Sequence, residues 1–155
     1  MTFDEAFAKL IEHEGGYVND PADPGGETKY GISRRAYPGE DIAGMTLERA
    51  KTIYQRDYWG PAGCDAVPPG VKFQVFDCAV NSGVAATIKL VQRAVCTVPD
   101  GVLGPQTLMA IQSMPVPRFV ARFNAQRLAL LVGLPTWPRF GRGWVLRAVD
   151  NLMEA

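Results

Sequence analysis

The sequence carries no excess charge and no long apolar run. Its 16 lysines and arginines are balanced by 16 aspartates and glutamates, so the formal net charge is zero. Proteins that bind polyanions usually carry a basic excess or stripe, so we expect no nucleic-acid partner. The longest apolar stretch, Leu128 to Leu134, is far shorter than the roughly 20 residues that a membrane-spanning helix requires, and we expect no membrane span.

Histidine and cysteine are too scarce to indicate a metal or redox centre. The chain has one histidine and three cysteines, Cys64, Cys78 and Cys96, and no two cysteines have CxxC spacing. No cluster of side chains has the spacing of metal ligands, so we expect neither a metal nor a cofactor. Three cysteines cannot all pair within one chain, which favours reduced and mostly buried thiols in a protein folded in the cytoplasm. Acidic residues near the amino terminus, with no apolar run after them, argue against a signal peptide.

The first helix is predicted to carry a carboxylate at the end of its apolar face. Thr2 and Glu5 form a capping-box signature, and Gly15 and Gly16 are expected to end the helix. Glu14 continues the apolar stripe, which recurs at helical spacing. The stripe consists of Phe3, Phe7, Leu10 and Ile11. Two interpretations stay open: Glu14 projects against apolar side chains, or the helix frays after Ile11 and Glu14 points to water.

If Glu14 projects against apolar side chains, it has the character of a general acid. Burial disfavours the ionised form of a carboxyl group and raises its pKa, which keeps the proton near neutral pH. The following loop is rich in turn-forming residues and carries Asp20, Asp23 and Thr28. The pieces 17–18 and 28–32 on either side of it are expected to form a small hairpin. Glycoside hydrolysis uses one protonated carboxyl and one ionised carboxylate, and these two environments assign Glu14 the first role and an aspartate the second.

The rest of the sequence predicts helices around one buried segment. At 155 residues and 47% hydrophobic content, the chain is expected to form a single domain over 1–155. The segment 71–80 is apolar nearly all round, which predicts a central buried helix ended by Gly83. A rigid proline-containing loop over 135–138 is expected to precede the last helix. The other expected helices cover Thr46 to Tyr58, a segment that buries Ile88, Val91 and Val95, Pro105 to Met114, Pro117 to Leu131, and a last segment from about Gly143.

Three further side chains are candidates for binding a sugar. Gln74 and Asn81 lie seven residues apart on the central helix and share one face, where they interrupt an apolar surface. They either line a cleft or satisfy backbone groups in the core. Tyr30 lies in the acid-bearing loop, and its ring either stacks on a sugar or belongs to the core.

Two motifs resemble a known family. The run from Glu14 reads Glu-Gly-Gly-Tyr-Val-Asn-Asp-Pro, and the run from Asp23 to Ile32 reads Asp-Pro-Gly-Gly-Glu-Thr-Lys-Tyr-Gly-Ile. Both are similar to the signature of glycoside hydrolase family 108, N-acetylmuramidases of phages and Gram-negative bacteria that were first described as secretion activators. The resemblance extends over nearly the whole chain through blocks that begin at Asp57, Phe76, Asp100 and Trp137.

The resemblance implies a fold, a site and a substrate. The implied fold is mainly α and lysozyme-like, with a small N-terminal hairpin lobe and a larger helical lobe around the buried helix. Residues 1–70 would hold the acid helix, and residues 71–155 would resemble the family's peptidoglycan-binding region. Phage-type lysozymes place their aspartate at the spacing of Glu14 and Asp23, whereas Thr28 comes one residue sooner than theirs. Asp20 therefore stays an alternative to Asp23.

The implied activity is hydrolysis of the β-1,4 bond between N-acetylmuramic acid and N-acetylglucosamine in bacterial peptidoglycan, with lysis of the cell. A chitinase-like glycosidase and a non-catalytic wall-binding or secretion-associated module are the alternatives. The protein is expected to be a monomer and a phage or prophage product. It would be made in the cytoplasm without a signal peptide and act in the periplasm after release.

Overall fold

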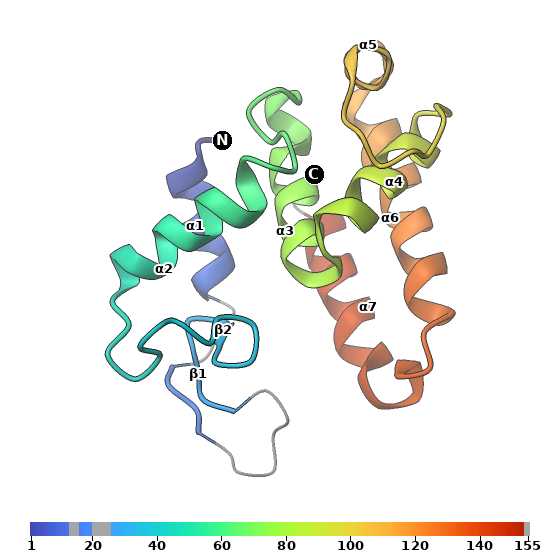
Figure 1. The fold of residues 1–155 in the computed structure, drawn as a ribbon. Coiled ribbons are helices and arrows are strands. Elements are labelled where there is room, and N and C mark those ends of the chain that lie inside the picture. The colour runs from blue at the N-terminus through green and yellow to red at the C-terminus, as the bar shows by residue number, and fades with distance from the viewer. Residues whose placement is uncertain (13–15, 20–25, 154–155) are drawn as a thin grey trace. The chain divides into compact units, whose positions relative to one another are not determined.

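The computed structural model describes residues 1–12, 16–19 and 26–153 of the chain (Figure 1). Within these residues it contains seven α-helices and one two-stranded antiparallel sheet, and it is 63% helical. The predicted mainly-α class is therefore confirmed. The chain forms two compact units, an N-terminal unit over residues 2–57 and a helical unit over residues 58–155 together with Met1.

The N-terminal unit begins with the predicted capping box. Helix α1 spans Phe3–Glu12. The backbone N–H of Glu5 donates to Thr2 Oγ1 at 3.3 Å, and the Thr2 N–H donates to Glu5 Oε2 at 2.7 Å. The two residues thus satisfy each other's free donors at the helix start, and this local motif fixes where α1 begins.

Helix α2, Leu47–Tyr54, packs on α1 through aromatic rings. The ring centroids of Phe7 and Tyr54 are 5.6 Å apart, and those of Phe3 and Phe7 are 5.8 Å apart. Lys51 Nζ also lies 3.0 Å from Asp4 Oδ1. Burial of these aromatic rings gives the N-terminal unit its core.

Thr46 caps α2 as predicted, and its side chain accepts the Arg49 N–H at 3.2 Å. The helical path continues past Tyr54 as a π-helical segment, Gln55–Trp59. The predicted helix to Tyr58 is therefore present, but its hydrogen-bonding pattern changes at Gln55. The boundary between the two units falls inside this segment, after Asp57.

The hairpin differs from the prediction. Strands β1, Thr28–Lys29, and β2, Ile32–Ser33, pair with each other, so the piece expected to be one strand is itself a hairpin. The reason is the turn between them, in which Tyr30 and Gly31 have φ values of 51° and 74°. Positive φ at both central residues of a two-residue turn matches the twist of antiparallel strands. The expected pairing with Val18 is present as a single antiparallel bridge to Thr28.

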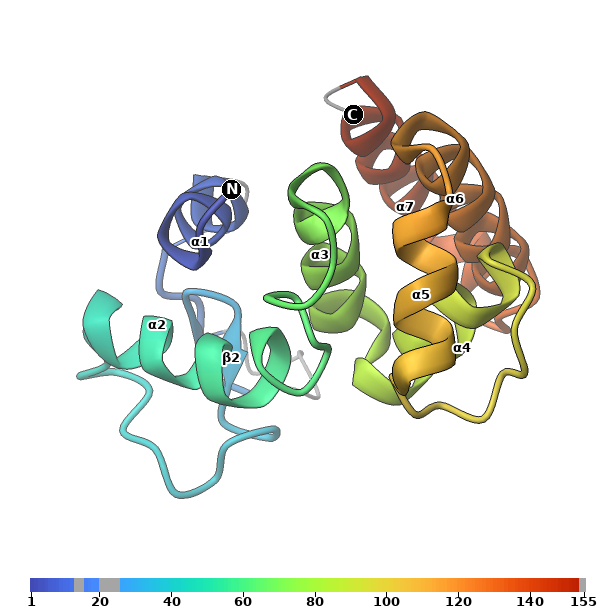
Figure 2. The same cartoon turned by 90° about the horizontal axis from the view of Figure 1, so that it is seen from above.

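The helical unit is built around α3, Lys72–Ser82, as predicted. Every residue from 73 to 79 is buried in this helix, and Gly83 ends it. Around it lie α4, Val84–Ala94, and α6, Val116–Val132, with α7, Trp137–Met153, running along α6 (Figures 1 and 2). A short helix α5, Pro105–Ser113, starts at the predicted proline.

The predicted start of the last helix is wrong. Helix α7 begins at Trp137 and not near Gly143, and residues expected to form a rigid loop make its first turn. The N–H groups of Arg139 and Phe140 both donate to the Thr136 carbonyl at 3.1 Å. Pro138 fits there because the first turn of a helix needs no N–H from it.

All three cysteines are free thiols, two of them buried. Burial raises the pKa of Cys64 to about 12 and also raises the pKa of Cys78, whereas Cys96 is exposed. Across the described ranges, no helix combines the length and the apolar character that crossing a bilayer demands.

Candidate functional site

The described residues of α1 stop two positions before Glu14, the predicted acid. Phe3, Phe7 and Leu10 are buried, so the apolar stripe that Glu14 was predicted to continue is present. The helix is described as far as Glu12. Glu14, Asp20 and Asp23 lie outside the described residues, and their roles stay predictions.

Thr28 pairs through its backbone with Val18, and these two residues flank the segment of sequence that carries both aspartates. Its N–H donates to the Val18 carbonyl at 2.8 Å, and the Val18 N–H donates to the Thr28 carbonyl at 2.8 Å. On its other side, Thr28 pairs with Ser33 of β2. The Thr28 hydroxyl is half-buried and donates to the Gly26 carbonyl at 3.4 Å. Backbone pairing on both sides fixes the position of Thr28, and the bond to Gly26 orients its hydroxyl.

Tyr30 is fixed by its backbone. Its carbonyl accepts the Tyr54 hydroxyl at 3.0 Å, which ties the hairpin turn to α2. Lys29 Nζ lies 5.6 Å from the centroid of the Tyr30 ring and donates to the Ala43 carbonyl at 3.0 Å. A positive φ is uncommon for a residue other than glycine, so these contacts stabilise a turn that Tyr30 alone would disfavour.

A second acidic group of the N-terminal unit was not singled out from the sequence as a site residue. Asp57 Oδ2 accepts the Tyr37 hydroxyl at 3.0 Å, and Arg56 donates to both Asp57 oxygens at 2.6 and 2.7 Å. The hydrogen bond from Arg56 lowers the pKa of Asp57, and the one from Tyr37 adds to this effect. Asp57 is therefore an ionised, paired carboxylate, unsuited to donate a proton.

Gln74 and Asn81 share a helix but not an environment. Gln74 is only 3% exposed; its Nε2 donates to the Asn151 carbonyl at 2.6 Å, and its Oε1 accepts from Asn124 at 3.3 Å. This arrangement favours the interpretation that Gln74 satisfies core groups. Asn81 is exposed, and its Nδ2 donates to the Asp77 carbonyl at 2.7 Å. Of the two, Asn81 alone is placed to meet a ligand.

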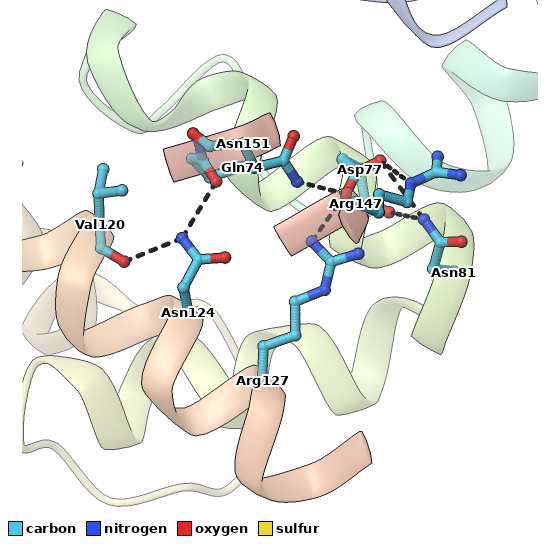
Figure 3. Close-up of polar contacts among 8 residues, drawn as sticks. All are labelled: Gln74, Asp77, Asn81, Val120, Asn124, Arg127, Arg147 and Asn151. Atoms are coloured by element: carbon cyan, nitrogen blue, oxygen red, sulfur yellow. Dashed lines mark hydrogen bonds and ion pairs between the residues drawn. The ribbon is translucent and has the colours of Figure 1, made fainter. Parts of the chain in front are cut away.

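Asp77 is the centre of a buried polar cluster (Figure 3). It is 1% exposed and accepts Arg127 Nη1 at 2.7 Å, Arg147 Nε at 2.6 Å and Asn151 Nδ2 at 2.7 Å. These donors come from α6 and α7, so one carboxylate joins three helices. The sequence signal was a charged aspartate within a largely apolar helix.

The described residues contain no group of three or more His, Cys, Asp or Glu side chains arranged to hold a metal ion. Several described carboxylates are instead paired with arginines, as in the Arg34–Glu27 pair at 2.7 Å and the Arg56–Asp57 pair.

Comparison with known proteins identifies the family of this chain. The sequence model of the family described as glycosyl hydrolase 108 matches residues 7–83. A solved structure of SagA from Brucella abortus is similar over 97% of this chain and 91% of that chain, with 35% identity and a TM-score of 0.88. The chain belongs to glycosyl hydrolase family 108. No curated protein matches it.

Membership of family 108 makes the chain a glycoside hydrolase with a mainly-α, lysozyme-like fold. The family match includes every candidate site residue, from Glu14 through the loop and hairpin to Asn81. It therefore covers the N-terminal unit from Phe7 onward and all of α3, and it ends at Gly83, the glycine that terminates α3.

Proposed function

We propose that this member of family 108 is an N-acetylmuramidase. It would hydrolyse the β-1,4 bond between N-acetylmuramic acid and N-acetylglucosamine in bacterial peptidoglycan, and cutting enough strands would lyse the cell. The observation that supports the proposal is the family match over 7–83, because it contains Glu14, which the sequence predicts to continue the apolar stripe of α1, together with the loop aspartates.

The chemistry assigns complementary roles to two carboxyl groups. Glu14 would protonate the glycosidic oxygen, so that N-acetylglucosamine leaves with a neutral 4-hydroxyl. Asp23, with Asp20 as the alternative, would stay ionised and stabilise the developing oxocarbenium ion or hold the water. Water adds its hydroxyl to C1 of N-acetylmuramic acid, and its remaining proton restores the acid.

Thr28 supports the ionised carboxylate in this proposal. Its hydroxyl is held at the base of the loop by backbone pairing with Val18 and Ser33. A hydroxyl fixed in advance orients water or a carboxylate at less entropic cost than a mobile one. We expect the loss of this hydroxyl to lower the rate less than the loss of Glu14.

The test replaces the proposed acid and a neighbouring glutamate in parallel. Glu14→Gln should fold normally and lose about 10²–10⁴-fold or more of its rate on purified sacculi, because an amide cannot donate the proton. Glu12→Gln, at the exposed end of α1, is the matched control and should keep the wild-type rate. Release of reducing sugar gives the rate.

The alternative functions predict different results. Equal rates for the two variants would remove Glu14 from the mechanism. A chitinase-like enzyme would cleave chitin oligomers in preference to sacculi. A wall-binding module would sediment with sacculi and release no reducing sugar from either substrate.

A further inference from the structure

The helical unit contains a cavity whose lining includes Asn81, one of the residues predicted to line a cleft. Its volume is about 360 Å³, and it lies among α3, α4, α6 and α7. Most of its wall is apolar, formed by Leu130, Leu131, Leu134 and Trp144. The Trp144 ring is held in place by Trp137 and Phe140, whose centroids lie 6.2 and 6.0 Å from its own.

One end of this cavity is polar and carries a buried arginine with unused donors. Arg127 lines the cavity, and its side chain is 3% exposed. A guanidinium group has five N–H donors. Among the described residues Arg127 makes one hydrogen bond, from Nη1 to Asp77, and its Nε has no partner. An unsatisfied donor at such depth costs free energy, which a ligand oxygen would recover.

Asn81 supplies an acceptor beside this donor. Its Nδ2 is committed to the Asp77 carbonyl at 2.7 Å and lies 3.4 Å from Asp77 Oδ1. The Asn81 Oδ1 is thereby left to accept, and within the described part of the chain it has no partner. Asp77 thus contacts both side chains, because Arg127 donates to its Oδ2 and Asn81 donates to its backbone carbonyl (Figure 3).

We propose that this cavity is a binding site for the acetamido group of an N-acetylhexosamine. The carbonyl of that group accepts from Arg127, its N–H donates to Asn81, and its methyl enters the apolar wall beside the Trp144 ring. A carboxylate fits less well, because it has only acceptors and would place an oxygen against Asn81 Oδ1. The proposal rests on the proposed function, since it names how the helical unit holds the glycan strand.

The test compares an acetylated sugar with its deacetylated counterpart. Chitotetraose should bind the wild-type protein at least tenfold more tightly than the chitosan tetramer does, measured by isothermal titration calorimetry. Mass spectrometry after each titration checks that the oligomer is intact. Equal affinities, or no binding of chitotetraose, would overturn the proposal.

Two alanines on α4 give a matched pair of variants. Ala86 lines the cavity, whereas its neighbour Ala85 is exposed and lies outside it. Ala86→Leu narrows the cavity and should weaken chitotetraose binding at least tenfold, while Ala85→Leu should keep the affinity within twofold. Identical affinities of the two folded variants would contradict the site.

A measurement on the wild-type protein keeps the proposal testable if Ala86→Leu folds poorly. The Nε–Hε resonance of Arg127 should shift on addition of chitotetraose and stay in place with the chitosan tetramer. A resonance that moves with neither sugar or equally with both would overturn the proposal. Hydrolysis of sacculi is assayed separately. A protein that does not hydrolyse sacculi but still prefers the acetylated sugar would refute the proposed function alone. A protein that hydrolyses sacculi but shows no preference for the acetylated sugar would refute this binding site alone.

Discussion

At the scale of single residues, Asp77 contributes most to the organisation of the helical unit. It accepts hydrogen bonds from residues that follow it by 50, 70 and 74 positions in the chain. A sequence pattern reports which residues share a helix face, whereas these partners are brought together by packing of α6 and α7 on α3. For this reason Gln74 and Asn81 were predicted as a pair, and the structure assigns them to different surroundings.

We predict that Asp77→Asn destabilises the protein strongly. The change removes the negative charge that Arg127 and Arg147 share, and the cost of leaving the buried Arg127 without a counter-charge is about 3–5 kcal/mol. The free energy of unfolding, from urea denaturation, measures this effect. Asp65→Asn is the control: its side chain is 80% exposed, its Lys72 partner is 4.0 Å away, and we expect a change within about 0.5 kcal/mol. Similar values for both variants would show that the cluster contributes little.

At the scale of elements, features set by neighbouring residues were predictable from the sequence, whereas features set by residues distant in the chain were not. The capping box at Thr2, the Thr46 cap and the glycine stop at Gly83 depend only on residues within one turn, and all three are confirmed. The hairpin turn at Tyr30 was missed, because a tyrosine with φ of 51° is disfavoured by its own preference and is held by Tyr54 from α2.

Two glycines in the helical unit should respond to alanine with opposite signs. Gly83 joins α3 to α4 at φ 83° and ψ 152°, a conformation that is essentially restricted to glycine. Gly83→Ala should therefore cost about 1–3 kcal/mol of unfolding free energy through backbone strain, since no heavy atom lies within 4 Å of the added Cβ. Gly143→Ala, inside α7 and equally free of contacts, should stabilise the protein by about 0.5–1 kcal/mol.

Thermal and urea unfolding of both variants provide the measurement. A neutral Gly83→Ala would mean that the joint between α3 and α4 relaxes to an ordinary conformation. A destabilising Gly143→Ala would mean that α7 is not regular at this position.

At the scale of the whole molecule, the proposed chemistry and the proposed glycan contacts divide between the two units. The N-terminal unit carries Glu14, both loop aspartates and Thr28, and the helical unit carries Asn81 and the cavity. The sequence predicted the mainly-α class, the central buried helix and the family. Its single-domain organisation stays a prediction, and the catalytic roles rest on the family motif and the apolar stripe of α1.

Mass spectrometry of purified sacculi digested by the wild-type protein identifies which glycosidic bond the enzyme cleaves. We expect soluble fragments that end in a reducing N-acetylmuramic acid and that are absent from a digest by Glu14→Gln. Fragments with reducing N-acetylglucosamine ends, or the same products from both proteins, would show that the protein is not a muramidase that uses Glu14 as its acid.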